Sequence, residues 1–313
     1  MCWGMGSFIA SGVNRGALAM DAGNSSLPGW RMAYIVQWIW PVPLLAAAFF
    51  APESPWWLIR HGKVDEAKRT LTRIASPGYW DTRPMDAYIA VIKHTDDMER
   101  AESAKGSFRD MWRGSNLRRT EIEMGVWAMQ VWSGTAMTAY AVQFFKSAGM
   151  STDTAFNLNI VITAMNLIGC MIEFVLISKF GRRPLILTGM AILASMLLVI
   201  GILGSVTTTN STLVGTGAAC AIINLVYHGT VGPLTYTVAA EVPASRLRAR
   251  TVAFGRAFYV INYNATSQLT PRMVAPKTNI GGWGWRGKAA FFWLGGNLLA
   301  TTWAYFRMPE TGG

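Results

Sequence analysis

The stretch PLILTGMAILASMLLVIGILGSVTTTNSTLVGTGAACAIINLVYHGTVGPLTYTVAA, residues 184–240, decides the fold class. It contains 57 consecutive residues without an Asp, Glu, Lys or Arg. A helix needs about 20 mainly apolar residues to cross the hydrocarbon core of a bilayer. The stretch is therefore long enough for two crossings, and its two apolar runs, 184–206 and 212–240, predict two membrane-spanning helices.

The rest of the chain has the same apolar character. Its 313 residues are 51% hydrophobic and 14% charged, and they include 14 tryptophans, whereas about 25% of the residues in a soluble domain are charged. Together with the two runs above, six further apolar runs predict an all-α integral membrane protein with about eight transmembrane helices. The other runs are residues 1–20, 32–50, 122–145, 154–177, 251–275 and 289–306.

The first run admits a second interpretation, because the Ala-Leu-Ala sequence at 17–19 imitates the cleavage site of a signal peptide. A signal peptide has a basic start, whereas Arg15 lies near the far end of this run. We favour a membrane helix, in which Arg15 must face protein or water.

The Lys and Arg residues predict the orientation in the membrane. Segment 51–120 carries 13 of them, and the loops SKFGRRP (178–184) and EVPASRLRAR (241–250) carry three each. Loops rich in Lys and Arg stay on the cytoplasmic side. The loop at 276–288 is an exception, with three basic residues on the predicted outer side. Because the basic residues lie mainly between apolar runs, the net charge of +11 indicates a membrane protein and no nucleic-acid partner.

Segment 51–120 is predicted to be a cytoplasmic linker of short amphipathic helices. Its stretch VDEAKRTLTRI places Val64, Ala67, Leu71 and Ile74 on one helical face and charged residues elsewhere. This spacing is typical of a helix that packs one face against other helices.

The sequence favours no metal site, cofactor or enzyme chemistry. The cysteines fall inside apolar runs, where they act as small packing residues. The histidines are isolated from one another, and no paired carboxylates lie within the spans. These residues are Cys2, Cys170, Cys220, His61, His94 and His228.

Several short motifs occur in a fixed order along the chain. They are GWR (29–31), PESPWWL (52–58), SKFGRRP (178–184), GP (232–233) followed by AEVPASRLRART (240–251), and PET (309–311). In order and spacing they resemble the sugar-porter family of the major facilitator superfamily. The stretches QWIWPVPLLAAAFFAPESPWWL and GKAAFFWLGGNLLATTWAYFRMPET are most similar to fungal alpha-glucoside (maltose-type) permeases.

The resemblance implies a twelve-helix fold of two six-helix halves, with the substrate held between them near the middle of the membrane. Set against that pattern, this chain begins at helix five, so the resemblance implies a fold truncated at its N-terminus. Residues 1–50 would be the last two helices of the first half. Residues 51–120 would be the linker, and 121–313 the complete second half.

The resemblance also implies a set of sugar-contacting residues, because polar groups within a span are costly unless they face a cavity or a partner. Met129, Thr135, Tyr236 and Ser7 stand where the family often has glutamine, asparagine, tryptophan and glutamine, which indicates an altered site. For Gln130 and Asn166 the alternative role is a hydrogen bond between helices. The candidates are Gln130, Thr135, Asn166, Tyr236, Tyr140, Tyr259 and Asn262.

Charged residues at the cytoplasmic helix ends form a second implied set. In the family, ion pairs there hold the inner side closed, and breaking them permits inward opening. Ser178 replaces an acid that often precedes the basic loop, so part of the usual network is absent. The candidates for this gating network are Glu53, Arg182, Arg183, Glu241, Arg248 and Glu310.

The function implied by the resemblance is transport of an alpha-glucoside or hexose by alternating access. Coupling to protons is also implied, with a multi-pass location in the plasma membrane and with sugar, protons and the lipid bilayer as partners. Two alternatives stay open at this point. One is a truncated transporter or incomplete gene model without activity, and the other is a sensor that binds sugar without moving it.

Overall fold

The computed structural model describes residues 2–22, 28–104, 107–206, 209–244, 247–277 and 281–311. These residues form helices joined by turns, and none of them lies in a strand. The all-α prediction is therefore confirmed. The chain divides into two compact units, one made of Met1–Tyr34, Met111–Ala244 and Arg248–Gly313, the other of Ile35–Asp110 and Ser245–Leu247.

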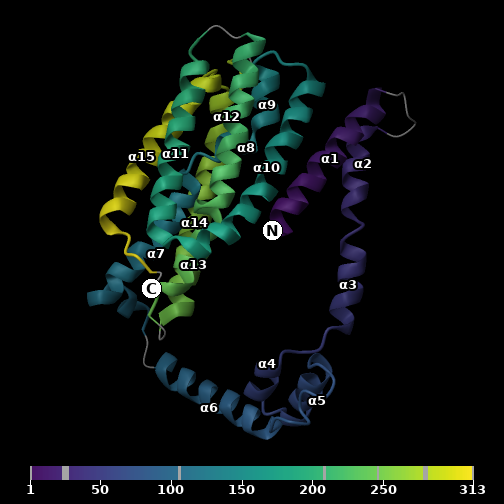
Figure 1. Ribbon diagram of the computed structural model, residues 1–313, viewed down its shortest axis with the longest axis vertical. Helices are drawn as coiled ribbons and strands as arrows, with labels where there is room; N and C mark the ends of the chain where they lie inside the picture. Colours follow the sequence, from purple (N-terminus) through teal and green to yellow (C-terminus); the bar gives the residue numbers. More distant parts are fainter. Residues whose placement is uncertain are drawn as a thin grey trace. The chain divides into compact units, whose positions relative to one another are not determined.

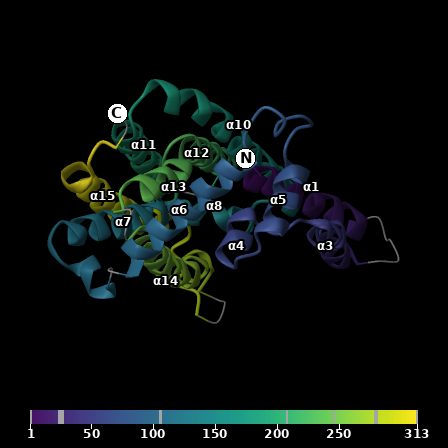
Figure 2. The same cartoon turned by 90° about the horizontal axis from the view of Figure 1, so that it is seen from below.

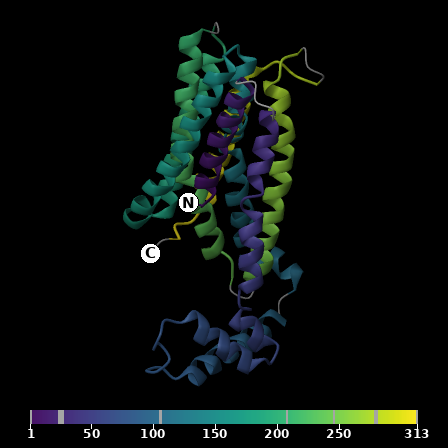
Figure 3. The ribbon, with the colours of Figure 1, turned by 90° about the vertical axis from the view of Figure 1, so that its right-hand side faces the viewer.

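The first unit is a bundle of long helices that run side by side (Figure 1). Seen from below, α11, α12 and α13 lie next to one another, with α7 and α15 alongside (Figure 2). The helix that follows α13 in the sequence, α14, is long and uninterrupted (Figure 3). The helices are α1 (Cys2–Ala22), α7 (Gly114–Trp132), α8 (Ala136–Ala139), α9 (Ala141–Ser147), α10 (Thr152–Lys179), α11 (Arg182–Leu203), α12 (Asn210–Gly229), α13 (Val231–Glu241), α14 (Arg248–Val274) and α15 (Ala289–Arg307), with the short 3-10 helices η1 (Phe108–Trp112) and η3 (Arg286–Lys288).

Side-chain caps fix where two of these helices begin. The Ser151 hydroxyl accepts a hydrogen bond from the backbone N–H of Thr154 at the start of α10. At the start of α12, Thr209 and Thr212 each accept the backbone N–H of the other. Such caps satisfy N–H groups that have no partner within the helix, which matters most where little water is available.

Runs 122–145 and 212–240 are interrupted helices. Run 122–145 is divided by a turn at Ser133–Thr135, where Gly134 has a φ of 93°. Run 212–240 is divided at Thr230, whose φ and ψ are −139° and −82°. A positive φ of this size is readily adopted by glycine and by few other residues. The turn after α7 therefore requires a glycine at position 134.

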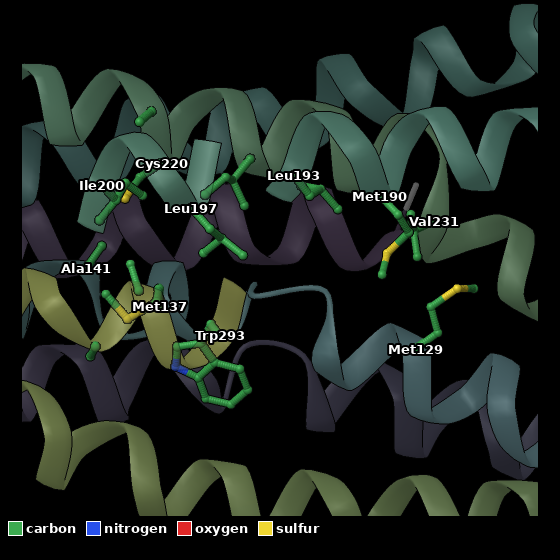
Figure 4. Packing of buried hydrophobic residues seen from close by; sticks show 14 of the residues in the cluster. Met129, Met137, Ala141, Met190, Leu193, Leu197, Ile200, Cys220, Val231 and Trp293 are labelled. Carbon is green, nitrogen blue, oxygen red and sulfur yellow. The ribbon is translucent and has the colours of Figure 1, made fainter. Parts of the chain in front are cut away.

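The apolar core of the first unit lies between α11 and the helices around it (Figure 4). Leu197 and Ile200 of α11 are fully buried, as is Trp293 of α15. Leu197 packs against the turn at Gly134, where an added Cβ atom would lie 2.5 Å from Leu197 Cδ1. The core thus holds the interruption of the α7 segment in place.

Polar contacts join α1 to α10. The Arg15 guanidinium donates to Asn157 Oδ1 at 2.8 Å and forms an ion pair with Asp153 at 2.9 Å. Farther along, Asn159 Nδ2 donates to Ser11 Oγ at 3.0 Å. Arg15 therefore faces protein, as expected for a charged residue in this run.

The second unit contains α3 (Pro41–Phe50) and the predicted linker helices. Its apolar core is made of residues from α4, α5 and α6. Ala67 and Leu71 are buried as the helical face predicts, but the Ile74 side chain at the end of α5 is 59% exposed. The carboxylate of the buried Asp96 pairs with Arg60 and Arg100. The linker helices are α4 (Pro55–Arg60), α5 (Val64–Ile74) and α6 (Met85–Ala104).

Run 32–50 corresponds to α2 (Gly29–Gln37) and α3, with a turn at Trp38–Trp40 between them. Pro41 opens α3, and the chain becomes extended at Ala51, just before Pro52. Among the described residues, four segments are long and apolar enough to cross a membrane: 29–50, 152–179, 182–203 and 210–241.

Candidate functional site

Gln130 joins the two interrupted segments. It lies near the C-terminal end of α7 and is buried, and its Nε2 donates a 3.0 Å hydrogen bond to the carbonyl oxygen of Gly232. Gly232 is the second residue of α13, directly after the interruption at Thr230. The Gln130 side chain also lies beside the Tyr227 hydroxyl. The hydrogen bond between helices, weighed from the sequence as the alternative role of Gln130, is present.

An aromatic cluster lies one turn from Gln130 toward the start of α7. Trp127 is buried, and the rings of Tyr236 and Tyr259 meet it edge-on at centroid distances of 5.0 and 5.5 Å. Tyr259 also stacks on Tyr263 at 5.8 Å. Tyr236 and Tyr263 are about half exposed, so part of the aromatic surface of the cluster is accessible. Trp127 is buried within the cluster.

Two charged groups contact Trp127. The Arg256 guanidinium lies 4.8 Å from the Trp127 ring centroid and 4.3 Å from that of Tyr259, within the range of cation–π attraction. The Glu123 side chain is 1% exposed and accepts a 2.9 Å hydrogen bond from Trp127 Nε1. Glu123 Oε2 and Arg256 Nη1 are buried without a hydrogen-bond partner.

Three further candidates lie on α14 or in the interrupted segment that packs against it. Asn262 Oδ1 accepts a 3.3 Å hydrogen bond from Trp132 Nε1, and the Tyr140 hydroxyl donates to the carbonyl oxygen of Ser267 at 3.2 Å. Thr135 lies at the turn itself, with its hydroxyl 3.2 Å from that of Ser133. These contacts hold α14 against the interrupted segment.

Asn166 lies apart from this group. It is buried in the middle of α10, and its Oδ1 has no hydrogen-bond partner. No contact among the described residues joins its side chain to the other candidates. A buried amide oxygen without a partner is costly.

Asn297 was not identified from the sequence. It is fully buried on α15, and its Nδ2 donates to the Ser133 carbonyl oxygen at 3.2 Å, so it binds the turn that follows Gln130. Glu123 and Trp127 were also missed. For Asn297 and Glu123 the available signal was a polar or charged residue within an apolar run, the criterion that selected Asn166.

At the helix ends that are predicted to be cytoplasmic, four of the six gating candidates lie together. The Glu310 carboxylate accepts the backbone N–H groups of Arg182 and Arg183 at 2.9 and 3.2 Å, at the start of α11. The Arg182 side chain forms a 3.3 Å ion pair with Glu241. A carboxylate at a helix N-terminus is favoured by the helix dipole and by the free N–H groups there. Thus α11, α13 and the segment after α15 are linked.

The other two gating candidates lie elsewhere. Arg248 is an exposed residue at the start of α14. No ion pair joins it to Glu241 or Glu310 in the described part of the chain. Glu53 belongs to the second unit, where its carboxylate accepts the backbone N–H of Ser54 at 2.9 Å.

The described residues contain no group of three or more potential metal ligands.

The helical bundle, its interrupted helices and its buried polar groups define a multi-pass membrane protein of the transporter class. A family model described as "Sugar (and other) transporter" matches residues 1–313. The chain therefore belongs to this sugar transporter family.

Curated relatives include yeast permeases. The general alpha-glucoside permease of Saccharomyces cerevisiae is 33% identical over 315 residues, which cover 100% of this chain and 50% of the relative. Maltose permease MAL31 from the same organism has the same identity and coverage. The chain thus spans about half the length of the curated relatives it matches.

Solved structures of the xylose transporter XylE from E. coli share the fold. A partially occluded inward-open form has a TM-score of 0.72 at 21% identity and covers 99% of this chain and 62% of that chain. A second structure shows XylE, described as a proton:xylose symporter, bound to 6-bromo-6-deoxy-D-glucose. Its TM-score is 0.70 at 20% identity, and the match covers 98% of this chain and 64% of that chain. The predicted family and fold class are confirmed.

Proposed function

We propose that this chain takes part in transmembrane transport of an alpha-glucoside by alternating access, and that it supplies the C-terminal wall of the sugar site. The permease relatives support the substrate class, since the general alpha-glucoside permease is 33% identical along the whole chain. Residues 1–50 would be the last two helices of an N-terminal half, 51–120 the linker and 121–313 the C-terminal half. A plasma-membrane location and coupling to protons belong to the same proposal.

The observation that carries the proposal is the bond between Gln130 and Gly232, which joins two interrupted helices beside an aromatic cluster. Interrupted membrane helices expose backbone polar groups, and transporters place such groups at their substrate sites. A sugar needs hydroxyl partners and an apolar face to pack against. Gln130, Asn166 and Asn262 supply amides, and Tyr236 supplies a half-exposed ring.

Arg182, Arg183, Glu241 and Glu310 are proposed to act in gating. Their contacts connect the inner ends of α11, α13 and α15. All four belong to the proposed C-terminal half, so their contacts hold the inner ends of its helices in one rigid arrangement. Closing the inner side against the other half requires a partner from outside the C-terminal half. Glu53, which lies in the linker, is the proposed contributor, and Arg248, which lies in the same half as the other four, completes the proposed gating set.

Uptake of radiolabelled maltose in a host that lacks maltose transporters tests the proposal. We expect saturable uptake by the full chain and loss of uptake in Gln130→Leu, with equal amounts of protein in the membrane. Binding of maltose without uptake would favour the sugar sensor instead. Neither binding nor uptake would reject both sugar functions and favour the inactive chain.

A further inference from the structure

An apolar groove runs between α7, α14 and α15. Its volume is about 380 Å³, within the range of about 300–1,000 Å³ that is typical of ligand pockets. The groove is lined only by apolar residues, among them Ala128, Phe258 and Ala300. Sugar hydroxyls would have no partner here, so the groove is distinct from the polar candidate site.

Two tryptophan rings on two glycines shape the groove. Trp303 lies over Gly125, where an added Cβ atom would be 2.1 Å from the ring, and Trp132 lies over Gly296, where the distance would be 2.3 Å. Leu299, at the edge of the groove, is 75% exposed. The groove therefore opens to the surface of a membrane helix bundle, where the surrounding medium is lipid.

Charged residues follow the groove toward the predicted cytoplasmic side. The Arg307 guanidinium binds both carboxylate oxygens of Glu121 at 2.9 Å, and Trp303 Nε1 donates to the same carboxylate at 3.4 Å. Arg118 is exposed and precedes Glu121 by three residues and Gly125 by seven, so it lies on the groove face of α7. Arg118, Arg307 and Glu121 together give this end of the groove a net charge of +1.

We propose that the groove binds an acyl chain of an anionic phospholipid from the cytoplasmic leaflet, whose phosphate lies between Arg118 and Arg307. The apolar lining suits the chain, and the net positive charge suits the headgroup. Basic side chains at the cytoplasmic end of membrane helices attract anionic lipids by about 1 kcal/mol each. The flat tryptophan rings leave a continuous apolar wall along which an extended chain packs.

Native mass spectrometry of the purified, delipidated full chain tests this proposal without reference to transport. Dioleoyl phosphatidylglycerol, dioleoyl phosphatidylcholine and cholesterol are added separately. We expect the phosphatidylglycerol to bind most tightly. Arg118→Gln should weaken the binding of phosphatidylglycerol about fivefold. The binding of phosphatidylcholine should be unchanged, because only the attraction to the anionic headgroup is lost.

Ala128→Phe and Ala300→Phe each fill the groove and should abolish the preference for phosphatidylglycerol. The matched controls, Lys179→Gln at another exposed inner cation and Ala191→Phe on the exposed face of α11, should bind as the wild type does. Circular dichroism melting curves identify any variant that has not folded. Equal binding of the two phospholipids, stronger binding of cholesterol, or unchanged binding in Arg118→Gln and in both folded groove variants would overturn the proposal.

Discussion

Gln130 on α7 donates a 3.0 Å hydrogen bond to the carbonyl oxygen of Gly232 on α13. The two residues are 102 positions apart, and each lies next to a point where its helix is interrupted. One side chain therefore ties together two helix breaks within the membrane.

Replacing Gln130 by leucine removes this bond while keeping a side chain of similar volume. Hydrogen bonds between membrane helices contribute about 0.6 kcal/mol on average and up to about 1.7 kcal/mol. We expect a modest fall in the melting temperature of the detergent-solubilised chain. Gln143→Leu is the matched control, because Gln143 is exposed on α9. Identical losses of stability in the two variants would contradict a structural role for the Gln130 bond.

Gly134→Ala should destabilise the turn between α7 and α8. The φ of 93° is unfavourable for alanine, and the new Cβ atom would lie 2.5 Å from Leu197 Cδ1. A residue in such a conformation costs about 1–3 kcal/mol. Adding Leu197→Ala removes the overlap but not the backbone strain, so the double variant should not regain stability.

The control for this prediction is Gly295→Ala on α15, where an added Cβ atom meets nothing within 4 Å. Thermal melting of all the variants in one detergent provides the comparison. A Gly134→Ala variant as stable as Gly295→Ala would show that the turn does not depend on glycine.

Trp127→Phe should destabilise the chain through Glu123. The variant keeps an aromatic ring but removes the N–H that donates to Glu123 Oε1, and Glu123 Oε2 already has no partner. An unsatisfied buried polar group costs about 1–3 kcal/mol, more if charged, whereas removing both partners can be nearly neutral. We therefore expect Trp127→Phe/Glu123→Leu to melt above Trp127→Phe alone. A double variant that melts lower than the single one would refute this explanation.

Glu310→Ala should loosen the start of α11. The carboxylate accepts two backbone N–H groups there, and loss of such a cap costs about 0.5–2 kcal/mol. Glu310→Gln retains one acceptor oxygen but not the charge, so its loss should be smaller. Melting temperatures at low and high salt separate the two contributions, since only the charge term is screened. Equal stability of the alanine and glutamine variants would contradict the cap.

The sequence was sufficient for the fold class because its signals are local. The charge-free stretch 184–240 and the basic loops around it need no knowledge of tertiary contacts. The motifs SKFGRRP and PET also indicated that Arg182 and Glu310 matter at the inner helix ends, and the structure brings these residues together.

The interruptions could not be located in this way. The turn at Gly134 depends on Leu197 and Asn297, which are distant in sequence. Hydropathy could not reveal it, because residues 124–145 carry no charge and the run continues across the turn. Trp127 was overlooked for a related reason, since a tryptophan in an apolar run looks like packing until Arg256, Tyr236 and Tyr259 are found around it.

Equilibrium binding of radiolabelled maltose to the purified chain tests the central claim most directly, because it does not require transport. The account predicts saturable binding to the wild type and to Gln143→Leu, and at least about tenfold weaker binding to Gln130→Leu, since one lost hydrogen-bonding group at a sugar site is worth about 1.4 kcal/mol or more. Maltose binding that is absent from the wild type, or that is unchanged in a folded Gln130→Leu variant, would contradict it.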